Sequence, residues 1–166
     1  MIDKLINKLQ KEGKIRKQKA GIIQIEALLR DAVSDLKEAK SISHLAERAT
    51  YMLAYVAMLK AGRALLLLYG YIPDDGAQHK TVVEITSSIL GDKYRNLTEQ
   101  FESMRRKRNE MTYSAGVLLS KTESRIAFSD AISLVKKIFT EVRSKNSQLE
   151  LEFDLDNETK NNTQKS

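Results

Sequence analysis

Residues 105–113 hold the side chains that are best suited to chemistry in this sequence. Guanidinium and ammonium groups bind phosphate, an amide can orient it, and a phenol offers a hydroxyl or a stacking face for a base. Together these groups predict a surface that binds an anion such as RNA or a nucleotide. The candidate residues are Arg105, Arg106, Lys107, Arg108, Asn109 and Tyr113.

Arg108 occupies a position where its helix is expected to be apolar. Apolar residues recur there at steps of three and four, the spacing of one buried helical face, and position 108 continues the series. Because burying an unpaired guanidinium is very costly, we expect Arg108 to meet an anion in a polar cleft or at an interface. The alternative is that Arg108 lies near a helix end and reaches water. The apolar members are Tyr94, Leu97, Phe101, Met104 and Met111.

Arg105, Asn109 and Tyr113 follow one another at intervals of four residues, so they share a stripe if the helix persists. Arg108 lies about 100° around the helix from Asn109. In this interpretation Arg108 holds a phosphate, Asn109 orients it, and Tyr113 contributes a hydroxyl or a stacking face. The alternative role for Tyr113 is to cap the core of the protein.

The net charge of the 166-residue chain is +6, and it is unevenly distributed. Residues 150–166 are acidic, which leaves 26 basic and 17 acidic side chains in residues 1–149. The excess positive charge of residues 1–149 favours polyanionic partners. The alternative is that the lysines of these residues are only exposed to solvent and bind no partner.

Composition also excludes several classes of site. Cysteine is absent, so neither a disulfide framework nor a cysteine metal site is possible. His79 has only Asp74 and Asp75 as neighbouring ligands, so we expect a hydrogen-bonding histidine, no metal and no cofactor. Charged residues interrupt the longest apolar segment, 45–69, and no signal peptide is visible. We therefore expect a cytoplasmic protein that does not cross a membrane.

The hydrophobic periodicity predicts an all-α fold, an antiparallel bundle of five or six helices formed by residues 1–146. Ser43 is the expected N-cap of the central, most buried helix, and Gly70 is expected to end that helix. Ile126 is expected in the core, Gly62 is expected to permit close helix packing, and no strand is expected before residue 147. The expected helices span roughly residues 2–12, 20–40, 44–69, 78–90, 92–112 and 121–144.

Residues 147–166 are expected to form a flexible acidic tail, in which apolar and acidic residues alternate from 149 to 155. The tail either solubilises the protein or docks in extended form on a partner. It contains a segment that resembles the hexapeptide by which bacterial proteins bind the DNA sliding clamp. Alternatively, the last helix continues through Leu149. The matching positions are Gln148, Leu149, Leu151 and Phe153.

Residues 20–144 resemble the HEPN superfamily of small helical proteins. The resemblance lies in the apolar run 54–70, in His79-Lys80 and in the basic run 105–113. It implies a homodimeric helical bundle, and members are often RNases of toxin–antitoxin or defence systems, paired with a minimal nucleotidyltransferase. Arg108-Asn109 matches the beginning of the family's catalytic signature, an arginine followed after four to six residues by a histidine.

Tyr113 stands where four intervening residues would place the signature histidine. Metal-independent RNA cleavage needs a proton acceptor and a proton donor, and an imidazole suits both roles better than a phenol. We therefore expect an RNA- or nucleotide-binding module, with weak or absent ribonuclease activity carried by Arg108, Asn109 and Tyr113. The alternative is a non-enzymatic adaptor that docks on the sliding clamp.

Overall fold

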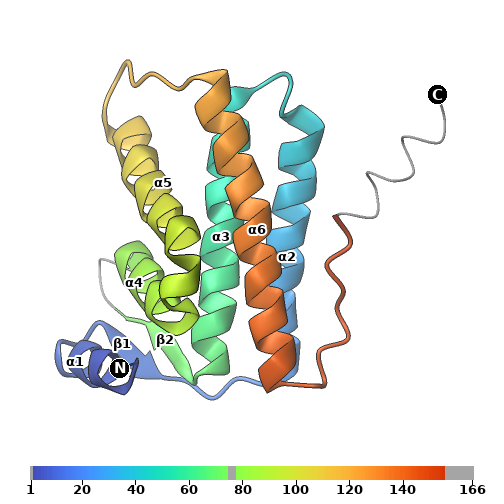
Figure 1. Cartoon of the computed structure of the whole chain (residues 1–166). Coiled ribbons are helices and arrows are strands. Elements are labelled where there is room, and N and C mark those ends of the chain that lie inside the picture. The colour runs from blue at the N-terminus through green and yellow to red at the C-terminus, as the bar shows by residue number, and fades with distance from the viewer. Residues whose placement is uncertain (1, 75–77, 156–166) are drawn as a thin grey trace.

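The computed structural model describes residues 2–74 and 78–155 as an antiparallel bundle of helices (Figure 1). The four long helices alternate in direction, and two shorter helices lie at one side, next to a small two-stranded sheet. The predicted all-α class is therefore confirmed. The elements are α1 (Ile2–Lys11), β1 (Ile15–Lys17), α2 (Ile22–Ile42), α3 (Glu47–Leu68), β2 (Tyr71–Pro73), α4 (Gln78–Leu90), a 3-10 turn (Asp92–Tyr94), α5 (Arg95–Tyr113) and α6 (Lys121–Lys145).

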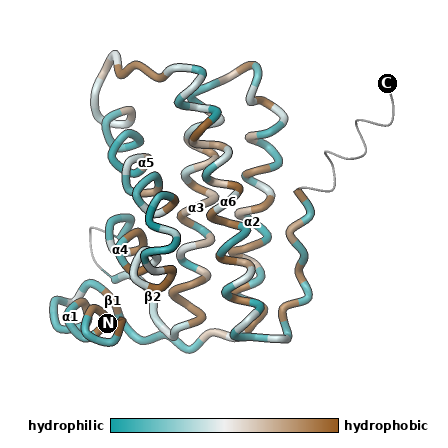
Figure 2. Tube along the Cα trace, in the orientation of Figure 1, coloured by the Kyte–Doolittle hydropathy of each residue, from teal (hydrophilic) through white to brown (hydrophobic). Residues whose placement is uncertain are grey.

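Helix α3 is the centre of the bundle, as its apolar sequence predicts. It packs against α2, α4, α5 and α6, its buried residues cover a broad arc rather than one narrow stripe, and none of its residues from Thr50 to Leu68 is exposed. It is the one helix in the described ranges long and apolar enough to cross a membrane by length and composition, and 61% of its most apolar window is buried inside the bundle. Figure 2 shows apolar residues alternating with polar ones along the long helices.

Gly62 allows α4 to approach α3 closely. A Cβ atom at this position would lie 2.6 Å from Cγ1 of Val82 and 3.0 Å from Oγ1 of Thr86, both on α4. The predicted packing role of Gly62 is thereby confirmed. The contact also sets the distance between α3 and the first turn of α4, which carries His79.

The prediction of no strand before residue 147 is wrong. Strands β1 and β2 pair antiparallel, with Ile15 opposite Pro73 and Lys17 opposite Tyr71. Gly70 ends α3 with a φ of +86° and turns the chain into β2. Each strand is only three residues long, which is too short for an alternating pattern to be visible in the sequence.

Two predictions about single residues are also wrong. Ser43 does not cap α3, because α2 continues to Ile42 and the Ser43 hydroxyl donates to the Lys40 carbonyl oxygen at 3.1 Å. Ile126 is 52% exposed rather than buried, because the face of α6 that meets α3 is formed by its neighbours Ala127 and Ser124.

Residues 147–155 pack on the bundle, residues 147–154 in a non-helical conformation, and Figure 1 shows them running beside α2. Helix α6 ends at Lys145, so the alternative that it continues through Leu149 is wrong. Leu149 is 5% exposed, and the ring of Phe153 meets the ring of Phe139 edge-on at 5.5 Å. The remainder of the predicted flexible tail, residues 156–166, lies outside the described residues, and its flexibility stays a prediction.

Candidate functional site

Helix α5 carries the predicted basic residues on an unbroken helix that ends at Tyr113. Phe101 and Met104 are fully buried against the bundle, and Arg108, one turn further along the same face, is half-buried. Its guanidinium makes no hydrogen bond or ion pair with any described residue, although it acts electrostatically on Tyr55 and His79. Arg108 thus holds a partly desolvated positive charge at the edge of the core.

Arg105 is held in place by a carboxylate one turn earlier on the same helix. Its Nε and Nη2 atoms donate to the two oxygens of Glu102 at 2.8 and 2.7 Å, a bidentate pair. The hydrogen bond from Arg105, together with one from Arg106, holds the pKa of Glu102 below its usual range despite partial burial. Glu102 therefore stays ionised and fixes the direction of the Arg105 side chain.

Next to these arginines lies a hydrogen-bonded pair of rings, the His79–Tyr55 pair. The hydroxyl of Tyr55, on α3, is 2.8 Å from Nδ1 of His79, in the first turn of α4. Tyr55 is fully buried and also packs against Phe101 of α5, with ring centroids 6.0 Å apart. His79 is half-buried. The pair therefore joins the three helices α3, α4 and α5 at the position of the basic residues.

Three arginines act electrostatically on the His79–Tyr55 pair. We call them the arginine cluster: Arg63 on α3, with Arg105 and Arg108 on α5. Burial lowers the pKa of His79, and the positive charges of Arg108, Arg63 and Arg105 lower it further, so the imidazole is neutral at neutral pH. Burial raises the pKa of Tyr55 to about 12, so its hydroxyl keeps its proton.

Arg63 adds an unsatisfied donor to this cluster. Its Nη2 donates to Oε1 of Gln78 at 3.2 Å, but its Nε is buried and has no hydrogen-bond partner among the described residues. Buried polar groups are rarely left unsatisfied, and a buried cationic donor is the most costly case. Two members of the arginine cluster therefore carry donors that an anion could satisfy.

The other predicted residues of α5 lie away from the His79–Tyr55 pair. Arg106 is exposed and Nζ of Lys107 pairs with Glu123 of α6 at 2.9 Å; both line a separate cleft of about 490 Å³. Asn109 is exposed, and Tyr113 is 79% exposed, so the alternative that Tyr113 caps the core is wrong. Within the described residues neither makes a hydrogen bond to Arg108 through its side chain.

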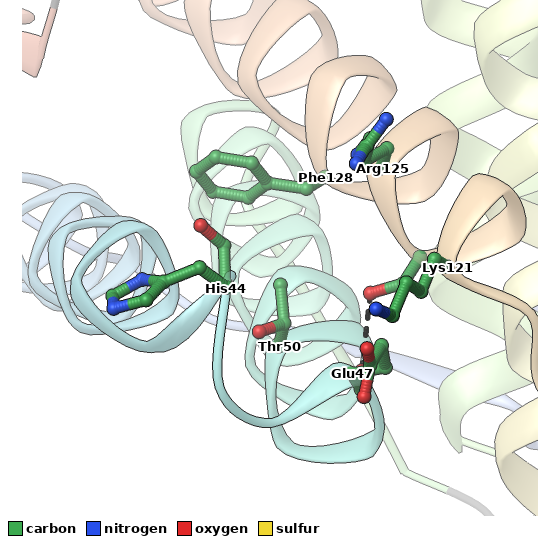
Figure 3. Close-up of a pocket in the computed structure, with 8 residues that line it drawn as sticks. His44, Glu47, Thr50, Lys121, Arg125 and Phe128 are labelled. Atoms are coloured by element: carbon green, nitrogen blue, oxygen red, sulfur yellow. Dashed lines mark hydrogen bonds between the residues drawn. The ribbon is translucent and has the colours of Figure 1, made fainter.

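A second group of polar residues lies at the turn between α2 and α3. A pocket of about 250 Å³ there is lined by residues from the turn, the first turns of α3 and the start of α6 (Figure 3). His44 belongs to this pocket, with Lys121 and Arg125 on the facing helix. Within the described chain, no three metal-ligating side chains are grouped so that they could hold an ion.

The clamp-like segment is folded against its own bundle. Leu149 is buried, while Leu151 and Phe153 are half-buried. The carbonyl oxygen of Leu151 accepts a hydrogen bond from Nη2 of Arg143 at 2.8 Å. Gln148 is exposed. Three of the four predicted partner-binding side chains are thus wholly or partly covered.

Comparison with known proteins assigns no family to this chain. No model of a known protein family matches it, and no curated protein is significantly similar to it. The site must therefore be interpreted from its own geometry. Sequence reasoning identified Arg105 and Arg108 but missed Tyr55 and Arg63, and it gave His79 only a local role. The one signal for Arg63 was its place as one of few charged residues in a mostly apolar helix.

Proposed function

We propose that the chain binds RNA or a nucleotide through phosphate at the arginine cluster. The supporting observation is that Arg63, Arg105 and Arg108 act electrostatically on one His79–Tyr55 pair, and that, among the described residues, only Arg105 of these three is paired with a carboxylate. Fork-shaped guanidinium donors match phosphate oxygens, and the low local dielectric strengthens the attraction. The excess positive charge of residues 1–149 would steer a polyanion toward the protein.

Binding can be measured by fluorescence anisotropy with a labelled single-stranded 2′-O-methyl RNA, which a ribonuclease that uses the 2′-hydroxyl cannot cut. We expect Arg108→Gln to weaken binding about tenfold and to reduce the salt slope by about one phosphate contact. Arg30→Gln is the matched control, because it removes the same charge from an exposed position of α2. Equal losses in the two variants, or no binding by the wild type, would refute the proposal.

We propose further that this bundle is a HEPN-like module of a toxin–antitoxin or defence system. The resemblance of residues 20–144 supports this role, with a homodimer and a minimal nucleotidyltransferase as the expected partners. Co-expression provides the test. Expression of the wild-type chain alone should slow bacterial growth, and expression of Arg108→Gln should not. Co-expression of the wild-type chain with a nucleotidyltransferase encoded by a neighbouring gene should restore growth. Growth that is unaffected by the wild-type chain would contradict the toxin role.

A second candidate function is docking on the DNA sliding clamp. The motif-like order of Gln148, Leu149, Leu151 and Phe153, on a segment that the structure holds outside any helix, supports it. A peptide of residues 146–155 should bind purified clamp, and changing Leu151 and Phe153 to Ala should abolish binding. Equal affinity of the two peptides would dismiss this function.

A further inference from the structure

The cleft of about 490 Å³ that Arg106 and Lys107 line is formed by different residues from those of the arginine cluster. Its other lining residues come from α5 and α6, and α3 contributes Tyr51. We call it the Tyr51 cleft. A cleft of this volume is large enough to hold a small molecule such as a nucleotide.

Tyr51 brings a hydroxyl without a partner to this cleft. Its side chain is only 4% exposed, and its hydroxyl makes no hydrogen bond with a described residue. Burial raises the pKa of Tyr51, and the negative charges of Glu123 and Glu110 raise it further, so the phenol keeps its proton at neutral pH. Because buried polar groups are normally hydrogen-bonded, the Tyr51 hydroxyl is a donor that a ligand in the cleft could satisfy.

Glu110 is the second group of the cleft that is left for a ligand. The other carboxylate, that of Glu123, pairs with Nζ of Lys107 at 2.9 Å, whereas Glu110 makes no ion pair with a described residue. The remaining cation of the cleft, Arg106, has its Nε bound to Glu102 at 3.0 Å. The two oxygens of Glu110, which can only accept hydrogen bonds, are therefore free to meet donors of a ligand.

Ile126 adds an apolar surface to these polar groups. It is 52% exposed and lines the cleft together with Tyr51. A flat ring bound in the cleft could pack on this side chain and remove apolar surface from water. The cleft therefore suits a ligand that combines a flat ring with hydrogen-bond donors on one edge.

Among the nucleobases, guanine fits this set of groups best. Its N1–H and 2-amino groups are adjacent donors, which match the two oxygens of one carboxylate, and its O6 oxygen accepts from a hydroxyl. Adenine, cytosine and uracil place an acceptor beside the donor on the same edge, and the Glu110 carboxylate would repel that acceptor. A cationic ligand is disfavoured because Arg106 and Lys107 line the same cleft.

We propose that the Tyr51 cleft binds guanine, which Glu110 and Tyr51 recognise through hydrogen bonds. This inference rests on the proposed function, in that RNA or a nucleotide supplies the base, but it concerns residues outside the arginine cluster. The guanine could belong to a free nucleotide or to single-stranded RNA, whose unpaired bases expose this edge.

The test compares guanosine monophosphate with inosine monophosphate, which lacks only the 2-amino group, by calorimetric titration. We expect guanosine monophosphate to bind about tenfold more tightly, because inosine loses one hydrogen bond to a charged group. Glu110→Gln should abolish this preference, and Tyr51→Phe should weaken binding of guanosine monophosphate several-fold. Glu99→Gln is the matched control, since it removes a carboxylate from an exposed position of α5 that does not line the Tyr51 cleft, and it should keep the preference.

Two short 2′-O-methyl RNAs that differ only in one guanosine or inosine distinguish the sources of the base. An equal preference for guanosine in the RNAs and in the nucleotides would assign the base to RNA, and a preference in the nucleotides alone would assign it to a free nucleotide. Both results support the inference.

Equal affinities for guanosine and inosine in both arms would overturn the inference. The proposed function would still stand if RNA bound and Arg108→Gln weakened that binding. A preference for guanosine that Glu110→Gln retained would place the base elsewhere and would also overturn the inference. Preferred binding of guanosine monophosphate, with RNA binding unaffected by Arg108→Gln, would refute the role of the arginine cluster alone.

Discussion

The hydroxyl of Tyr55 lies 2.8 Å from Nδ1 of His79 and joins the middle of α3 to the first turn of α4. Because Tyr55 is fully buried and His79 is half-buried, the core orients a ring at the edge of the molecule. Burial and the charges of the arginine cluster both lower the pKa of the same ring. The His79 imidazole is therefore oriented by a hydrogen bond to a buried residue and is influenced by the charges of three arginines.

Glu102 forms ion pairs with Arg105 and Arg106, so it would weaken the proposed binding of RNA at the arginine cluster. We expect Glu102→Gln to raise the affinity for RNA several-fold, since it frees guanidinium donors and removes a negative charge. The control Glu99→Gln removes a carboxylate from an exposed position one turn earlier and should have a smaller effect. Fluorescence anisotropy titrations at two salt concentrations measure the RNA affinity of both variants. Equal gains in affinity for Glu102→Gln and Glu99→Gln would argue against a specific role of Arg105.

Gly62→Ala should destabilise the fold. Alanine is preferred over glycine in a helix by about 1 kcal/mol, but the new Cβ would lie 2.6 Å from the Val82 side chain. Overpacking of this kind costs about 1–3 kcal/mol, so we expect the free energy of unfolding to fall by about 1 kcal/mol in urea denaturation. Gly21→Ala is the control, because a Cβ at that position meets nothing within 4 Å. An equally stable Gly62→Ala protein would contradict the packing described.

His79 makes stability depend on pH in a defined direction. Burial and the neighbouring arginines lower its pKa in the folded protein from the ordinary value of 6.5. The unfolded chain therefore gains a proton at a higher pH than the folded chain does. The stabilisation is complete above pH 6.5 and is lost as the pH falls through the lowered pKa.

We expect the free energy of unfolding to decrease between about pH 7 and pH 5 more steeply in the wild type than in His79→Gln, by this linkage. Urea denaturation across this range measures both slopes. Parallel slopes would show that the pKa of His79 is the same in the folded and unfolded chain.

The segment 147–155 should detach locally when its aromatic contact is removed. Phe153→Ala deletes the packing on Phe139, so we expect faster hydrogen exchange at residues 147–155 with little change in the rest of the bundle. Among the affected amides is that of Glu150, which donates to Oε1 of Glu26 at 3.2 Å. Unchanged exchange would show that Phe153 does not hold the segment.

The same packing predicts how the chain would bind a sliding clamp. Leu149 is buried and Phe153 contacts Phe139, so docking would first have to release the segment from the bundle. We expect an isolated peptide of residues 146–155 to bind clamp more tightly than the full chain does. Calorimetric titration of both ligands into clamp gives the comparison, and a tighter full chain would contradict it.

The sequence predicted the helices well because their periodic apolar faces are local patterns. The boundaries of α4 agree with the prediction, and the apolar seam of α5 correctly leads to a half-buried Arg108. The sheet was missed because pairing of β1 with β2 joins residues about 55 positions apart in segments of three residues.

The composition of the site could be predicted only in part. Arg105 and Arg108 lie on one helix, so their spacing is visible in the sequence. Tyr55 and His79 meet only because Gly62 lets α4 approach α3, a relationship between helices that no single-helix pattern contains. Tyr55 also lies in an apolar run, where a tyrosine is expected to be part of the hydrophobic core. The prediction extended the site from Arg108 to Asn109 and Tyr113 on the same helix, whereas the groups on which Arg108 acts electrostatically, Tyr55 and His79, belong to α3 and α4.

The most direct test of the central claim is the pKa of His79 by NMR, with and without a 2′-O-methyl RNA oligonucleotide. The chain has only two histidines, and His44→Gln identifies the second signal. We predict that His79 titrates below 6.5 in the free protein and that its pKa rises when bound phosphate neutralises the arginine cluster. A pKa of 6.5 or above that the oligonucleotide does not change would contradict the account.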